Sequence, residues 1–171
     1  MSDVYVSSWL NAFSAEKRRQ LAVDHSGVLS MRGSKELDRI VDIVRDHYQT
    51  AYAAISIIDR RAQVLLAERG LGIEETPRST AFCATTIQQD GEPLIVPDAR
   101  ADARFADFGS VQGDPFIRFY AGVPIADEAG LALGAVCVAD TQPLTTEFDR
   151  ALLVIMAHEV ERAVSSLVPA R

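Results

Sequence analysis

Four of the charged residues between positions 98 and 118 have types and spacing that suit the binding of a polar ligand: Asp98, Asp102, Arg104 and Arg118. Carboxylate and guanidinium groups together hold polar molecules through charge-assisted hydrogen bonds. The same groups also suit pairing with one another, Arg104 with Asp98 or Asp102, which would hold their loop in place. We favour the loop-holding interpretation, and the ligand-binding interpretation stays open beside it.

Aromatic side chains and a cysteine near this stretch suit the wall of a pocket. They are Phe82, Cys83, Phe105 and Tyr120. Aromatic walls fit a flat ligand such as a nucleotide base or a tetrapyrrole, and they fit an ordinary core equally well. Residues 116–121 alternate between two faces of a predicted strand, and alternation alone does not tell which set faces a cavity.

The two cysteines, Cys83 and Cys137, are far apart in the sequence and belong to no CxxC pair. A reducing compartment disfavours a structural disulfide, and free cysteines are often small buried hydrophobic residues. The three histidines lie in three separate helix-like segments, so we expect no metal site. We therefore expect reduced, noncatalytic thiols.

The elements that must position these residues follow from hydrophobic periodicity and turn signals. The helix of residues 34–48 begins at Ser34, and the last helix begins at Thr145 or Thr146 and runs to about Leu167. An N-terminal lead, residues 9–29, contains a helix that Ser14 caps and Gly27 ends. The predicted strands are residues 51–59, 62–68, 94–96, 116–124 and 131–139, and a further helix is predicted at 80–89.

This pattern predicts an α+β fold with a central antiparallel sheet of five to six strands. The helices of residues 34–48 and 145–167 pack on one face, and loop 98–113 with the short helix 80–89 covers a pocket on the other. Residues 1–33 form an N-terminal helical lead, and residues 34–171 form the domain with its C-terminal helix.

Surplus apolar surface on the terminal helices predicts a homodimer. Leu153 and Val154 add apolar surface beside the main stripe of the last helix, and the lead offers another apolar set: Trp9, Leu10, Phe13 and Leu21. Soluble monomers rarely expose patches of this kind. The basic cluster Lys17–Arg19 is expected to be a solvated helix face.

Composition limits the function classes. The chain has 171 residues and a formal net charge of −7, which argues against nucleic-acid binding through phosphate neutralisation. No apolar run reaches the ~20 residues of a membrane span, and the N-terminus lacks the pattern of a signal peptide. We expect a soluble, cytoplasmic protein without a membrane partner.

Five motifs in a fixed order resemble one family, the GAF domain, which is a regulatory module of bacterial histidine kinases and cyclic-nucleotide enzymes. The motifs are FCATTI, LIVPDA, DARF, IRFYAGVPI and LGAVCVAD, and the resemblance covers roughly residues 34–168. It implies a PAS-like sheet with a ligand pocket. It also implies a noncatalytic sensory module of two-component or related signalling that binds an unknown small molecule, dimerises, or does both, and relays a signal to a kinase or cyclase partner.

Two alternatives remain beside this interpretation. One GAF lineage reduces free methionine-R-sulfoxide through several cysteines, but the loops expected to supply the extra cysteines contain none here. The other alternative is a ligand-free dimerisation scaffold. Bilin attachment commonly uses a cysteine followed by histidine, whereas Ala84 follows Cys83 here. Cyclic-nucleotide binding in this family uses a signature that contains asparagine, and the one asparagine of this sequence, Asn11, lies outside the domain. The cofactor and the ligand stay unknown.

Overall fold

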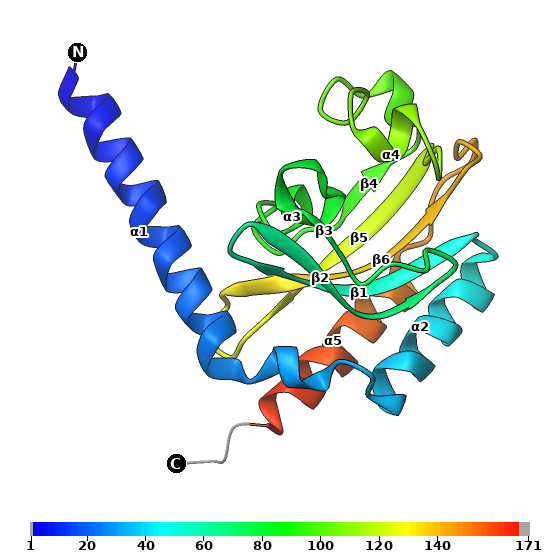
Figure 1. Cartoon of the computed structure of the whole chain (residues 1–171), viewed down its shortest axis with the longest axis horizontal. Helices are drawn as coiled ribbons and strands as arrows, with labels where there is room; N and C mark the ends of the chain where they lie inside the picture. The colour runs from blue at the N-terminus through cyan, green and yellow to red at the C-terminus, as the bar shows by residue number, and fades with distance from the viewer. Residues whose placement is uncertain (1, 168–171) are drawn as a thin grey trace.

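Six strands form one antiparallel sheet in the computed structural model, which describes residues 2–167 (Figure 1). The strands are β1 (Tyr52–Asp59), β2 (Ala62–Arg69), β3 (Glu75–Pro77), β4 (Leu94–Val96), β5 (Phe119–Ala126) and β6 (Ala132–Asp140). Their order across the sheet is β3-β2-β1-β6-β5-β4. The helices are α1 (Ser2–Ser26), α2 (Lys35–Tyr48), α3 (Phe82–Thr86), α4 (Gly109–Gln112) and α5 (Ala151–Ser165), with 3-10 turns η1 (Val28–Met31), η2 (Arg78–Thr80) and η3 (Ala99–Ala101). The predicted α+β fold is confirmed.

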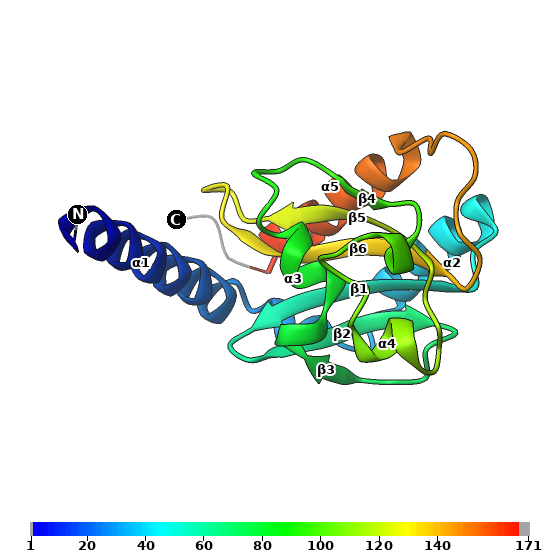
Figure 2. The ribbon, with the colours of Figure 1, turned by 90° about the horizontal axis from the view of Figure 1, so that it is seen from above.

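Helices α2 and α5 pack side by side on one face of the sheet and bury its main core (Figures 1 and 2). Apolar residues at helical spacing on α2 meet the strand residues that point to the same face, among them Ile55 and Ile57 of β1. Ser34 stands at the N-cap of α2 as expected, although its side chain makes no capping hydrogen bond.

The opposite face carries a second apolar cluster under α3, η3 and α4. Phe82 of α3 stacks on Phe105 and on Tyr120 of β5, with ring centroids 4.7 and 4.8 Å apart. The sheet therefore separates two cores. The edge strand β3 lies between the predicted strand of residues 62–68 and the predicted helix of residues 80–89, where the sequence predicts no strand. It pairs with Ala62–Val64 over only three residues, too short for an alternating pattern to reveal it.

Helix α5 begins later than predicted. Its first turn starts at Ala151, whose N–H donates to Asp149 Oδ1 (3.0 Å), so Thr145 and Thr146 are not the caps. The preceding segment is held elsewhere: Leu144 N–H donates to the Pro97 carbonyl (2.9 Å), and Phe148 stacks on Tyr48. These tertiary contacts outweigh the local capping signal.

The buried stripe of α5 also differs from the prediction. Leu153 is fully buried in the main core and therefore belongs to no exposed flank, while Ile155 is 53% exposed. Val154 is partly buried against the same core. The buried residues Leu153, Ala157, Val160 and Val164 share one face of α5 at helical spacing, and this face packs on the sheet, whereas the face that carries Ile155 points outward.

Helix α1 is continuous from Ser2 to Ser26, so Ser14 lies inside it and does not cap it. Gly27, with φ of 70°, ends the helix as predicted because glycine adopts the left-handed conformation without strain. The second half of α1 packs on the body of the domain, and the first half projects away from it (Figures 1 and 2). Within residues 2–167, no helix combines the length and the apolar character that a membrane crossing needs.

Candidate functional site

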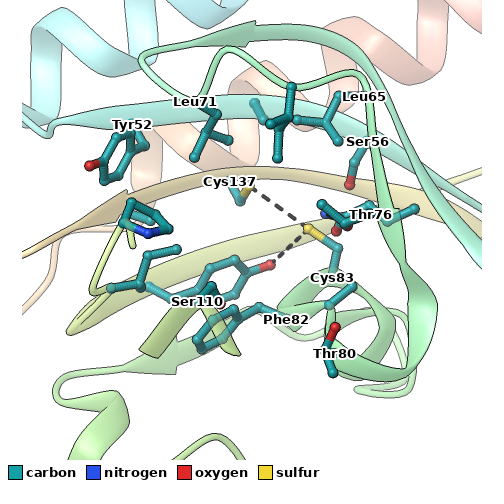
Figure 3. A pocket seen from close by; sticks show the side chains of 18 of the residues that line it. Tyr52, Ser56, Leu65, Leu71, Thr76, Thr80, Phe82, Cys83, Ser110 and Cys137 are labelled. Atoms are coloured by element: carbon teal, nitrogen blue, oxygen red, sulfur yellow. Dashed lines mark hydrogen bonds between the residues drawn. The ribbon is translucent and has the colours of Figure 1, made fainter. Parts of the chain in front are cut away.

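A pocket lies on the α3 side of the sheet, between β1, β2 and β6 and the cover formed by β3, η2 and α3 (Figure 3). Its cavity volume is about 220 Å³. Aromatic and aliphatic residues make up most of its wall: Tyr52, Ala54, Leu65, Leu71, Ile73, Pro77, Phe82, Ile117, Tyr120 and Ala139. The polar groups of the wall are Ser56, Gln63, Thr76, Thr80, Cys83, Ser110 and Cys137.

The pocket wall is uncharged. Among the residues that the structure describes, no Asp, Glu, Lys, Arg or His lines it. A charged ligand entering such a wall would lose its hydration without gaining a counter-charge, which is strongly unfavourable. The arrangement therefore suits a neutral molecule.

Two polar atoms in the wall lack hydrogen-bond partners within the described part of the chain. They are Ser56 Oγ and Gln63 Oε1, both buried. Gln63 Nε2 donates to Thr76 Oγ1 (3.0 Å), which holds the amide in place and leaves its oxygen without a donor. An unsatisfied buried polar atom costs about 1–3 kcal/mol, and a bound molecule that supplies a donor removes this cost.

Sulfur and hydroxyl groups gather at one end of the pocket. The Tyr120 hydroxyl lies 2.7 Å from Thr86 Oγ1 and 3.3 Å from Cys83 Sγ. The tyrosine ring reaches this position because it lies over Gly122: a Cβ atom there would stand 2.7 Å from Tyr120 Cζ. Burial raises the pKa of Tyr120 well above its ordinary value, and the thiols of Cys83 and Cys137 add to the rise, so the hydroxyl stays neutral.

Three of the predicted site residues line the pocket: Phe82, Cys83 and Tyr120. Phe105 lies behind Phe82, fully buried in the second core. The expected alternation holds only from Phe119 onward, where Phe119 points to the α2 side and Tyr120 to the pocket. Before it, Phe116 has φ of 60° and Ile117 packs in the pocket-side core.

The four charged residues lie outside the pocket wall and pair with one another. Arg118 forms a two-pronged pair with Asp98 (2.7 and 2.5 Å), and Arg104 forms one with Asp102 (3.0 and 2.7 Å). These pairs lower the pKa of both carboxyl groups, and Arg118 and Arg104 are the largest causes. Asp98 also accepts from Arg100 N–H at the start of η3. This geometry is that of a loop held by its own charges.

The cover of the pocket is joined to α1. Arg78 of η2 donates to both carboxylate oxygens of Glu16 (2.6 and 3.2 Å) and to the Arg60 carbonyl. Glu16 also accepts from Arg19, which is only 7% exposed and therefore does not belong to the solvated face expected for Lys17–Arg19. Burial raises the pKa of Glu16, but hydrogen bonds from Arg78 and Arg19 outweigh it and lower the pKa to about 2.

Sequence reasoning missed the polar wall formed by Ser56, Gln63 and Thr76. Gln63 and Thr76 are brought together only because β3 pairs with β2. Ser56 did leave a signal, since a serine inside the apolar run AAISIID marks a buried polar group. No group of three or more His, Cys, Asp or Glu side chains that could hold a metal ion occurs in the part of the chain with described coordinates.

Comparison with known proteins gives a consistent result. A family model described as the GAF domain matches residues 34–164. The chain is 40% identical over 154 residues to a cyclic di-GMP phosphodiesterase of Pseudomonas aeruginosa, and the match covers 89% of this chain and 26% of that protein. The chain thus spans about a quarter of the length of this curated relative.

Solved structures of other proteins share the fold, among them the following two. The GAF domain of a phosphoenolpyruvate-protein phosphotransferase from Acinetobacter superposes with a TM-score of 0.61 at 20% identity, covering 90% of this chain and 92% of that one. A type II free methionine-R-sulfoxide reductase from Thermoplasma acidophilum superposes with a TM-score of 0.64 at 12% identity, covering 81% and 96%. At these identities, the likeness concerns the fold alone.

Proposed function

Because the chain belongs to the GAF domain family, we propose that it is a noncatalytic sensory module whose pocket binds a small uncharged molecule. The observation that carries this proposal is the pocket wall, which combines an absence of charge among the described residues with two buried polar atoms that lack partners. Signalling is also the context of the relative from Pseudomonas aeruginosa, whose name assigns it a cyclic di-GMP phosphodiesterase activity.

Size and polarity narrow the ligand. The cavity of about 220 Å³ is smaller than the ~300–1,000 Å³ of ordinary drug-sized sites, so a single-ring molecule fits better than a dinucleotide. Gln63 Oε1 needs a hydrogen-bond donor, and the aromatic wall of Tyr52, Phe82 and Tyr120 suits a flat ring. We therefore assign the pocket to a neutral aromatic or heteroaromatic compound with an N–H or O–H donor.

The same wall disfavours the enzymatic alternative. A free amino acid such as methionine sulfoxide carries an ammonium group and a carboxylate group. The described part of the wall offers no counter-charge to either group. We expect no turnover of this substrate. Turnover that Cys83→Ser abolishes would instead establish a sulfoxide reductase.

A route for the signal leads from the pocket cover to α1. Thr80 lines the pocket at the end of η2, and Arg78 of the same turn holds Glu16. A ligand that shifts the cover therefore moves the anchor of α1. In this proposal, ligand binding changes how α1 packs against a second copy of the chain. That change is passed on to a cytoplasmic kinase, cyclase or phosphodiesterase domain.

The first half of α1, which projects from the domain, supports the proposed dimer. Trp9, Leu10 and Phe13 are 53–67% exposed, and the rings of Trp9 and Phe13 stack on the same side of the helix with centroids 5.9 Å apart. Pairing with the same surface of a second copy buries these rings.

Benzamide and benzoate test the ligand assignment because they have nearly the same shape and differ in charge. Titrated into the 15N-labelled chain, benzamide should shift the amide signals of Ser56 and Gln63, and benzoate should not. Gln63→Leu should weaken benzamide binding about 5- to 10-fold, the equivalent of one lost hydrogen bond. Arg104→Gln, outside the pocket, is the matched control. Tighter binding of benzoate, or shifts centred on Asp98 and Arg118, would contradict the assignment.

A further inference from the structure

Cys83 and Cys137 meet inside the pocket although they come from different elements. Cys83 lies on α3 and Cys137 in the middle of β6, and their Sγ atoms are 3.8 Å apart (Figure 3). Both are free thiols, 3% and 9% exposed, and both belong to the pocket wall. A peroxide-sized molecule that enters the pocket therefore reaches both sulfur atoms.

The two thiols differ in their surroundings. The hydrogen bond with Cys137 is the largest cause that lowers the pKa of Cys83, and the Tyr120 hydroxyl, 3.3 Å from its sulfur, adds to this effect. Ser56 contributes as well, although its hydroxyl makes no hydrogen bond of standard geometry. Cys83 in turn raises the pKa of Cys137 well above its ordinary value. Cys83 is thus the more readily deprotonated thiol of the two.

We propose that Cys83 and Cys137 form a redox modification site in which a hydroperoxide converts the dithiol to a disulfide within the pocket. The Cys83 thiolate attacks the peroxide oxygen, which forms an S–OH group and releases water or an alcohol once the leaving oxygen takes a proton. Cys137 then attacks the Cys83 sulfur. The S–S bond forms, the S–O bond breaks, and the hydroxide leaves as water with the proton of Cys137. Two electrons pass from the thiols to the peroxide.

The required movement is small. An S–S bond is about 2.05 Å long, so the sulfur atoms must approach by a little less than ~2 Å. Cys137 is fixed between Ala54 of β1 and Gly122 of β5, whereas Cys83 sits on a helix of five residues. We expect α3 to supply the movement. The bond removes the Cys83 thiol from Tyr120 and ties the pocket cover to the sheet, whether or not a ligand is present.

Intact-mass analysis and thiol titration test the proposal on the full chain. Stoichiometric hydrogen peroxide should remove both titratable thiols and lower the mass by two hydrogen atoms, and dithiothreitol should restore both. Cys137→Ser should stop at the S–OH stage, which dimedone traps at Cys83. In Cys83→Ser the remaining thiol should survive the same treatment.

Thermal unfolding of each variant shows whether it is folded. The mass and thiol measurements on the unchanged chain test the proposal even if a variant does not fold. Addition of oxygen atoms in place of loss of hydrogen would overturn the proposal. So would a disulfide that links two chains, or equal peroxide sensitivity of the two single variants.

Discussion

Glu16 joins α1 to the pocket cover, and its replacement by glutamine tests this connection directly. The carboxylate accepts from Arg78 and from Arg19, with four N–O distances between 2.6 and 3.2 Å. Glu16→Gln keeps the shape and removes the charge. Arg19, whose side chain is 8% exposed, then remains a nearly buried cation with the Ala132 carbonyl (3.3 Å) and Gln20 as its neutral partners.

The expected magnitude follows from burial. Hydrogen bonds to charged groups contribute about 1.5–3 kcal/mol when well shielded, but the Glu16 side chain is 41% exposed and solvent screens part of this. We expect Glu16→Gln to lower the free energy needed to detach the second half of α1 from the domain by about 1–2 kcal/mol. The population of the detached state should therefore rise roughly 5- to 30-fold. Arg78→Gln leaves the Arg19 pair intact, so its effect should be about 0.5–1 kcal/mol.

Native-state hydrogen exchange of the amides in residues 19–26 measures this opening. Lys17→Gln, exposed on the same helix, is the matched control and should change nothing. Acid gives a second readout. Because folding lowers the pKa of Glu16 from 4.5 to about 2, its stabilising contribution is complete above pH 4.5 and is lost as the pH falls towards 2.

The reasoning is refuted if Glu16→Gln and Lys17→Gln exchange at the same rate. It is also refuted if the acid-induced loosening of α1 is as large in Glu16→Gln as in the unchanged chain. A larger effect of Arg78→Gln than of Glu16→Gln would show that Arg19 is not the cation that depends on this carboxylate.

Two further changes test the pocket and the dimer. Tyr120→Phe removes a buried hydroxyl but leaves the Thr86 hydroxyl bonded to the Phe82 carbonyl. Urea unfolding should therefore show that the free energy of unfolding falls by about 0.5–1.5 kcal/mol. An unchanged free energy of unfolding would mean that the hydroxyl is exposed to water. Phe13→Glu, on the exposed surface of the projecting half of α1, should give monomers in sedimentation with the fold kept. The fully buried Leu153→Ala should cost about 2–5 kcal/mol of stability and leave association unchanged. A chain that is already monomeric at high micromolar concentration would contradict the dimer.

Strong periodicity and turn residues made the sheet and α2 predictable. Leu37, Val41 and Val44 all lie in the main core as their helical spacing indicates, and Gly27 ends α1. The errors arose where distant contacts overrule local signals. Thr145 and Thr146 suit a helix cap, but Leu144 is bonded to Pro97 and the helix starts only at Ala151.

The candidate site shows the same division. The sequence pointed to Phe82 and Tyr120 as wall candidates by their aromatic type and their place beside the charged stretch, but alternation left open which face they point to. The meeting of Cys83 with Cys137, and of Gln63 with Thr76, depends on pairing between elements far apart in the chain. No local pattern carries that information.

A sheet with a separate core on each face has a consequence for how the protein changes over generations. On β1, Ile55 and Ile57 belong to the main core, while Ala54 and Ser56 face the pocket. Because side chains alternate along a strand, a substitution is felt mainly on one side. Substitutions at Ala54 and Ser56 can therefore change the chemistry of the pocket wall without disturbing the packing that α2 and α5 provide. In terms of the proposed function, the pocket face of this sheet can change its chemistry while the helices on the other face keep their packing.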